Sequence, residues 1–170
     1  RFQNYMDTSA PGTAELSVAD FVQLYANNSI DFMVNQIYAN RQRTSTLNGI
    51  LKAEAALQVA QVLLKHNINL LKDFASISNI EAFERDFMQI PGQRSGVSLR
   101  YLYMLTGSVD HIKPDRMILR FINSAIGRTP KLDESHRMLL EVCRILKPEY
   151  PDLDPRSLDH LIWKFQRASS

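Results

Sequence analysis

Apolar residues recur every three to four positions along almost the whole chain, and this spacing is the feature that most constrains its fold. A period near 3.6 places such residues on one face of a helix, whereas a half-buried strand alternates apolar and polar residues. No stretch of this sequence keeps such an alternation. The chain has 170 residues, of which 45% are hydrophobic, and this suffices for a compact core. The sequence therefore predicts an all-α, multi-helix globular domain.

Residues that typically start and stop helices divide this pattern into segments joined by short loops. Ser78 and Glu81 have the spacing of a capping box, and Pro114 suits the first position of a helix. Gly107 and Gly127 suit the position just after a helix. The expected helices begin at Ser17, Ser29, position 49, Ser78, Gly96, Pro114, Asp133 and Asp154.

No linker is long enough to divide the chain, so we expect a single domain over residues 1–170. Its helical core spans 17–131, and the C-terminal helices, 132–170, are expected to pack back on the N-terminal segment. In the helix that begins at Gly96, Tyr101 lies on the apolar stripe, whereas Tyr103 lies off it. We therefore expect Tyr101 in the core and Tyr103 at the surface.

Cysteine and histidine usage limits the chemistry that the chain can perform. Its one cysteine, Cys143, cannot form an internal disulfide and lies among apolar residues, which favours a place in the core. None of the four histidines has the spacing of metal ligands, so we interpret them as surface or helix-cap residues. We expect no metal held by side chains and a reducing, cytoplasmic setting.

The distribution of apolar residues disfavours a membrane-spanning protein and a secreted protein. No run approaches the ~18–20 apolar residues needed to cross a bilayer, and the polar N-terminus lacks the apolar region of a secretion signal. We therefore expect no membrane partner and a cytoplasmic protein, associated with the nucleoid if it is bacterial. The sequence gives no indication of the oligomeric state.

Positive charge is concentrated in one segment, although the whole chain carries only +2. Residues 94–131 sum to +5, while residues 1–93 sum to −2 and residues 132–170 to −1. A surface that binds phosphate groups produces such segregation, because lysine and arginine replace the counterions condensed on a nucleic acid. The alternative is an ordinary solvated face of a helical protein.

The same segment resembles a known DNA-binding motif. Residues 90–98, IPGQRSGVS, followed by LRYLYMLTG and then by IKPDRMILRFINSAIG, resemble the helix-hairpin-helix and Gly/Pro-Asp loop of the endonuclease III-like DNA glycosylases. The resemblance covers roughly residues 48–127. The residues that fall in the family's order are Ile90, Pro91, Gly92, Ser98, Gly107, Asp115 and Arg120. It implies a glycosylase-like fold with a helix-hairpin-helix at 79–106 and a role in base excision repair.

The resemblance also implies a DNA partner that is contacted mainly through its backbone. A hairpin that presents the N-terminus of a helix offers unpaired N–H groups and the positive end of the helix dipole to a phosphate. The residues expected to contact DNA are Gly92, Gln93, Arg94, Gly96, Ser98, Arg116 and Arg120. In the family the hairpin carbonyls tend to hold a monovalent cation, and no other cofactor is expected.

Asp115 is the one candidate catalytic residue. At the matching position the family's aspartate faces the extruded nucleotide, where it can stabilise charge at the sugar or activate a water. An acid in the first turn of a helix is also favoured by the helix dipole, whether or not it does chemistry. Both roles stay open for Asp115.

Departures from the family pattern narrow the expected chemistry. Gly96 stands where bifunctional members carry the lysine that attacks the sugar, so no lyase activity is expected. Arg94 replaces the family's second hairpin glycine, and the family's first long helix is not found upstream. The hypotheses are a monofunctional N-glycosylase, a non-catalytic DNA binder, which we favour slightly, and an all-α protein interaction module in which Pro91 and Gly92 merely connect two helices.

Overall fold

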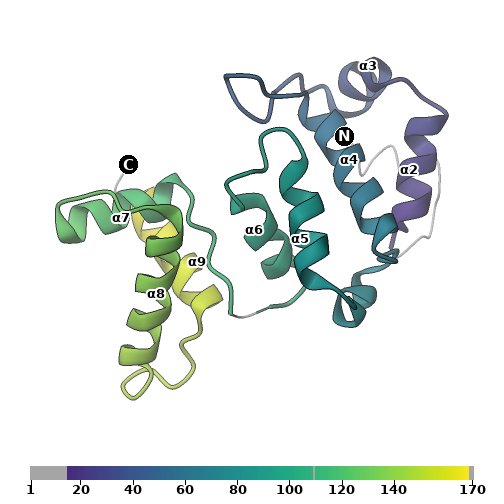
Figure 1. The fold of residues 1–170 in the computed structure, drawn as a ribbon. Helices are drawn as coiled ribbons and strands as arrows, with labels where there is room; N and C mark the ends of the chain where they lie inside the picture. Colours follow the sequence, from purple (N-terminus) through teal and green to yellow (C-terminus); the bar gives the residue numbers. More distant parts are fainter. Residues whose placement is uncertain (1–14, 109, 169–170) are drawn as a thin grey trace. The chain divides into compact units, whose positions relative to one another are not determined.

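The computed structural model describes residues 15–108 and 110–168, and helices dominate both ranges (Figure 1). The only extended pairing within them is an isolated antiparallel bridge between Arg43 and Leu51. The predicted all-α class is therefore confirmed. Over the same ranges, no helix is long and apolar enough to cross a membrane.

The chain forms two compact units, one ending at Arg94 and the other beginning at Ser95. Unit 1 holds α2 (Val18–Ala26), α3 (Ile30–Phe32), the π-helix η1 (Met33–Tyr38), α4 (Lys52–Lys65), the 3-10 helix η2 (Leu71–Ser76) and α5 (Ile80–Gln89). Unit 2 holds α6 (Val97–Leu105), α7 (Arg116–Ile126), α8 (Leu132–Leu146) and α9 (Pro155–Ala168). The boundary falls inside the loop of the predicted helix-hairpin-helix, so that motif stays a prediction.

In unit 1, α4 lies between α2 and α5 (Figure 1). Tyr25 of α2 is buried, and its hydroxyl donates to the carbonyl of Ala53 at 2.9 Å. The same hydroxyl lies 3.0 Å from that of Tyr38. Burial, together with the nearby Tyr38, raises the pKa of Tyr25. Buried alanines of α4 allow α2 to approach closely, and the tyrosine pair joins α2 to η1 and α4.

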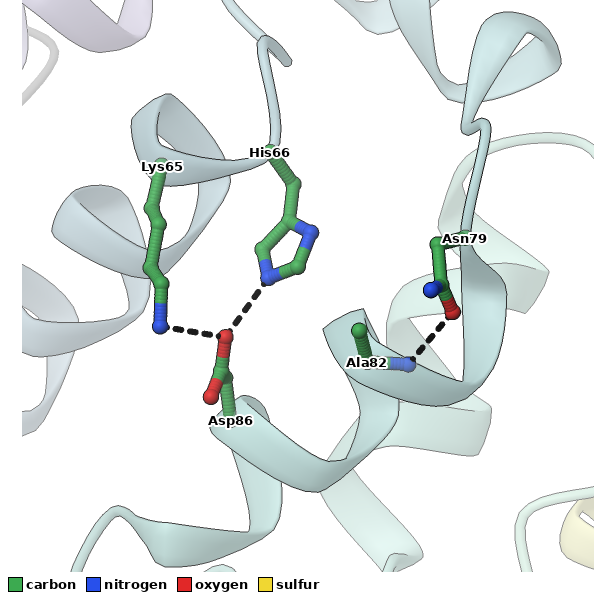
Figure 2. Close-up of polar contacts among 5 residues, drawn as sticks. All are labelled: Lys65, His66, Asn79, Ala82 and Asp86. Carbon is green, nitrogen blue, oxygen red and sulfur yellow. Dashed lines mark hydrogen bonds and ion pairs between the residues drawn. The ribbon is translucent and has the colours of Figure 1, made fainter.

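Two helix starts of unit 1 follow the predicted capping chemistry and two differ from the prediction, since α4 begins at Lys52 and not at position 49. Ser17 and Ser29 cap α2 and α3 through their side chains, as predicted. The predicted capping box at Ser78 is wrong, because α5 begins one residue later. The Oδ1 of Asn79 accepts the N–H of Ala82 at 3.0 Å (Figure 2). Asparagine caps helices at least as well as serine, so the sequence alone did not separate the two.

The turn after α5 is held by packing within unit 1. The N–H of Gln93 donates to the carbonyl of Ile90 at 2.9 Å, and the hydroxyl of Thr44 donates to the carbonyl of Pro91 at 3.1 Å. Gly92 has a φ of +85°, and a Cβ at this position would overlap the Cβ and Oγ1 of Thr44. Glycine is therefore required here both for the backbone conformation and for the close approach of Thr44.

Gly92→Ala should destabilise the protein more than Gly96→Ala. Both glycines have positive φ, but a Cβ at Gly96 would meet no atom within 4 Å. The left-handed backbone alone costs an alanine about 1–2 kcal/mol, and the overlap with Thr44 adds to that cost only at Gly92. Urea unfolding followed by circular dichroism measures both free energies. Equal losses for the two variants would contradict the packing described for Gly92.

In unit 2, α9 packs on both α7 and α8. Their shared core consists of Ile112, Ile118, Ile122, Leu139 and Ile162. α9 begins at the predicted position, because Asp154 and Ser157 cap it reciprocally. The side chain of each accepts the N–H of the other, at 2.6 Å for Asp154 and 2.9 Å for Ser157. The predicted contact of the C-terminal helices with the N-terminal segment involves residues 1–14, which lie outside the described residues.

Two helix starts in unit 2 differ from the prediction. α7 starts at Arg116, so Pro114 lies before the helix and Asp115 takes the capping position. α8 starts at Leu132 with Lys131 at its N-cap, and Asp133 lies in the first turn instead of capping it. In both places an acidic residue suits the cap and the first turn equally well, because both positions feel the positive end of the helix dipole.

The expected exposures of the tyrosines in α6 are reversed. Tyr101 is 42% exposed, whereas Tyr103 is 7% exposed. The ring of Tyr103 packs against that of His111, with centroids 4.8 Å apart. The buried face of α6 is formed by Leu99, Tyr103 and Met104. Apolar side chains occur on all sides of this short helix, so their periodicity alone did not predict which face is buried.

Candidate functional site

The predicted DNA-contacting residues are divided between the two units. Gly92, Gln93 and Arg94 lie at the end of unit 1, where Arg94 is exposed but the side chain of Gln93 is buried. The remaining residues lie in unit 2, with Ser98 in the first turn of α6 and both arginines on α7. The relative positions of these residues are therefore defined only within each unit.

The N-terminus of α6 is accessible and lacks a side-chain cap. Its N-cap residue, Gly96, has a φ of +71° and no side chain that could accept a hydrogen bond from the first turn. The first intrahelical bond runs from the N–H of Arg100 to the carbonyl of Gly96, at 3.0 Å. The N–H groups of the first turn precede this bond and point along the helix axis. Ser98 is exposed in this turn.

The basic segment is partly neutralised by the first turn of α8. Arg100 donates to Asp133 at 2.5 Å, and Arg128 forms a two-pronged pair with Glu134 at 2.5 and 3.2 Å. These hydrogen bonds lower the pKa of both carboxyl groups. Extending the segment from residue 131 to Glu134 reduces its net charge from +5 to +3. Arg116 and Arg120 lie one turn apart on α7, and both are exposed.

The structure gives Asp115 a definite structural role. Its Oδ1 accepts the N–H groups of Met117 at 2.9 Å and Ile118 at 3.3 Å, so it caps α7. Its Oδ2 lies 3.8 Å from the Nζ of Lys113. Asp115 therefore has the structural role expected at the positive end of a helix dipole, while its catalytic role stays a prediction.

Lys113 connects three parts of unit 2. Its ammonium group lies 4.2 Å from the ring centroid of Tyr101, on α6, and beside Asp115 at the start of α7. Its backbone N–H donates to the Oδ1 of Asp159, on α9, at 3.1 Å. Lys113 therefore lies where α6, α7 and α9 meet, and two carboxylates are close to it.

Asp159 is the functional candidate that sequence reasoning missed. Desolvation by burial, with a smaller contribution from the nearby Asp115 carboxylate, raises its pKa to about 6 against the lowering effect of the hydrogen bond from the Lys113 N–H. A signal was present in the sequence, because Asp159 precedes the buried residues Ile162 and Gln166 at helical spacing. The spacing of apolar residues alone did not predict this buried face, because the face includes polar side chains.

Asp159→Asn should stabilise the protein at neutral pH. The folded state raises the pKa of Asp159 from 3.8 to about 6, so the stabilisation by its bound proton is complete below about pH 4 and is lost as pH rises through about 6. Asparagine keeps an acceptor for Lys113 and is never charged. We expect a gain on the order of 1 kcal/mol at about pH 7.5 that shrinks toward zero at about pH 4, measured by urea unfolding. Parallel pH profiles for the two proteins would contradict the buried charge.

Two of the four histidines are less exposed than predicted, whereas His160 is exposed as expected. His66 is the C-cap of α4, as the cap interpretation requires, and its Nε2 lies 2.7 Å from the Oδ2 of Asp86 (Figure 2). Lys65 binds the same oxygen at 2.8 Å, and the two hydrogen bonds lower the pKa of Asp86. For His111 and His136 the prediction is wrong, because both are partly buried, with ring centroids 6.3 Å apart. Desolvation by burial, followed by the charge of Arg100, lowers the pKa of His136.

Cys143 is a structural residue. It is a free, buried thiol on α8, and burial raises its pKa, so the prediction of a core cysteine is confirmed. It lines a cavity of about 560 Å³ with Leu140, Lys147 and Leu153. The amine of Lys147 is already bonded to the carbonyl of Leu153 at 2.9 Å. A second cavity, of about 420 Å³, lies in unit 1 between α4 and α5.

The described residues offer little to hold a metal ion. Over residues 15–108 and 110–168, no group of three or more His, Cys, Asp or Glu side chains could bind one. The hairpin carbonyls were expected to hold a monovalent cation, but those of Ile90 and Pro91 already accept hydrogen bonds from Gln93 and Thr44. A carbonyl oxygen has two lone pairs, so these bonds do not exclude a cation, and the expected monovalent cation stays a prediction.

The sequence itself identifies the family. Residues 1–167 match the family described as "Domain of unknown function (DUF8548)", and the chain belongs to this family. Comparisons with curated proteins and with solved structures found no match. Membership of the family therefore assigns no activity, and any function must be argued from the site.

Proposed function

We propose that this member of the family is a non-catalytic DNA-binding protein that contacts backbone phosphates through the N-terminus of α6. The observation that carries the proposal is the accessible start of this helix. Gly96 provides no side-chain cap, and the space where a Cβ would stand is open. An anion can therefore approach the N–H groups of the first turn, because no side chain at position 96 stands in its way.

The electrostatics of unit 2 support the same proposal. Unpaired N–H groups and the helix dipole place about half a positive charge at the start of α6. Arg116 and Arg120 add exposed positive charge on α7. Contacts of this kind recognise phosphate groups and carry no information about the base sequence. We therefore expect binding with little sequence preference and a strong dependence on salt.

A binder without chemistry is favoured over a monofunctional glycosylase by the role of Asp115 and over a bifunctional one by Gly96. Asp115 already uses one carboxylate oxygen to cap α7, and its other oxygen faces Lys113. Gly96 has no side chain and cannot supply the amine nucleophile of a lyase. Neither residue requires a catalytic function to explain its place in the fold.

A second candidate, a protein interaction module, is favoured by the surface of α9. Leu161 and Phe165 lie one turn apart and are 54% and 57% exposed. Exposed apolar side chains that gather in one place often mark a protein interface. An interface of this kind would be much less sensitive to salt than binding to phosphates, so salt dependence separates the two candidates.

Ser98→Glu should weaken DNA binding without harming the fold. A carboxylate in the first turn of α6 repels phosphate, but it also favours the helix through the dipole. We expect fluorescence anisotropy with a short duplex to show a loss of about tenfold or more at ~50 mM salt, and a steep fall in wild-type affinity as salt rises.

Gln61→Glu is the matched control, because it makes the same change in charge at an exposed position of α4. It should bind almost as the wild type does. Wild-type binding that is independent of salt, or equal losses in the two variants, would contradict the proposed contact at α6.

The wild-type chain should release no free base from duplexes that carry uracil, oxidised or alkylated bases. Asp115→Asn should retain DNA affinity, because asparagine also caps helices, whereas Asp115→Ala should lose about 0.5–2 kcal/mol of stability. Chromatography of the released bases and urea unfolding check the two expectations. Base release that disappears in Asp115→Asn would show that the chain is a glycosylase.

A further inference from the structure

We propose that the exposed side of α9 formed by Leu161 and Phe165, which we call the apolar flank, binds an acidic amphipathic helix of another protein. Such a helix places its apolar side chains on the flank and its carboxylates opposite lysine and arginine side chains of α7 and α9. The inference rests on the second candidate function, whose partner it names, and it is independent of the DNA contact at α6.

The apolar flank continues the core of unit 2 to the surface. Phe121 and Leu158 are partly buried and pack against the core that α7, α8 and α9 share. The ring of Phe165 meets that of Phe121 edge-on, with centroids 6.0 Å apart. More than half of Leu161 and of Phe165 remains exposed. Leu158, Leu161 and Phe165 follow one another at steps of three and four residues, so they form one strip along α9, beside α7.

The exposed charges on the two helices that form this surface are of one sign. The acidic residue of α9, Asp159, is partly buried and accepts the N–H of Lys113. Lys164 stands between Leu161 and Phe165 in the chain and forms no ion pair with a described residue. A partner that covers the flank therefore meets positive charge, which carboxylates complement. The exposed charged residues of α7 and α9 are all basic, namely Arg116, Arg120, Arg156, Lys164 and Arg167.

These observations disfavour two other occupants. A second copy of the chain would bring the same basic side chains against those of the first, and like charges repel across an interface. A helix that binds a membrane turns its main apolar face to the bilayer, whereas the face of α9 that contains Ile162 is buried against α7 and α8. The strip that stays accessible suits the apolar face of one helix, which presents side chains at the same spacing.

Fluorescence anisotropy with labelled synthetic peptides tests the proposal. One peptide is a short amphipathic helix whose apolar face is leucine and whose other positions are glutamate. Its counterpart carries lysine in place of every glutamate. We expect the glutamate peptide to bind the wild-type chain and the lysine peptide to bind about tenfold more weakly or not at all, because its charge has the same sign as that of α7 and α9.

Variants of the apolar flank should weaken binding of the glutamate peptide. Leu161→Gln should weaken it about fivefold, because about half of this leucine is available for burial. Lys164→Glu should weaken it about threefold through charge. Ile145→Gln, at a similarly exposed position of α8, and Lys72→Glu, at an exposed position of unit 1, make the same two changes elsewhere and should bind as the wild type does. All four positions are exposed, so the variants should fold.

Ser98→Glu separates the apolar flank from the contact at α6. This variant is expected to weaken DNA binding, but it should leave binding of the glutamate peptide almost unchanged. If the peptide loses affinity in Ser98→Glu and keeps it in Leu161→Gln, its site is α6 and the docking proposal is wrong. Loss of DNA binding by the wild type would leave the docking proposal intact, because the flank does not need the DNA contact.

Further outcomes would overturn the proposal in distinguishable ways. If neither peptide binds, or if Leu161→Gln and Ile145→Gln bind equally, the flank is not a docking site for a helix. If the lysine peptide binds more tightly and Leu161→Gln weakens it, the second candidate function stands and the acidic partner is wrong. If Leu161→Gln instead abolishes flotation with vesicles of phosphatidylserine and phosphatidylcholine, or a dimer seen by analytical ultracentrifugation, the occupant is a membrane or a second copy.

Discussion

Unit 2 is organised around the hydrogen bond from the N–H of Lys113 to the carboxylate of Asp159. This bond fixes the segment that leads into α7 against α9, and the Lys113 side chain extends the connection to Tyr101 on α6. Its acceptor is a carboxylate whose burial raises its pKa, so the interaction is made at an electrostatic cost. A neutral acceptor such as an amide oxygen could also accept the N–H of Lys113, and it would avoid this electrostatic cost.

Helix boundaries were the most predictable part of the fold, because they depend on local chemistry. Ser17, Ser29 and Asp154 cap helices where the sequence placed them, and Gly127 ends α7 in a left-handed conformation. Errors arose where neighbouring residues could serve the same purpose, as with Ser78 and Asn79. The buried face of α6 was missed for another reason. Tyr103 is buried against the ring of His111, which lies outside the helix, so the spacing of residues within α6 did not predict which tyrosine is buried.

The candidate site was predictable only in part. The concentration of arginine and the glycine at the start of α6 are properties of the sequence, and the structure places Gly96 at a helix N-terminus as expected. Ion pairs were not foreseen, although Asp133 and Glu134 follow the basic segment directly and neutralise part of it. Asp159 was also missed, because the expected pattern for a buried helix face counts apolar residues and its place beside Lys113 depends on tertiary structure.

Backbone amide chemical shifts during titration with a short DNA duplex test the central claim most directly. The account predicts that the largest changes occur at Val97, Ser98 and Leu99, in the first turn of α6, and that added salt reverses them. Changes confined to the exposed face of α9 around Leu161, or no changes at low salt, would contradict it.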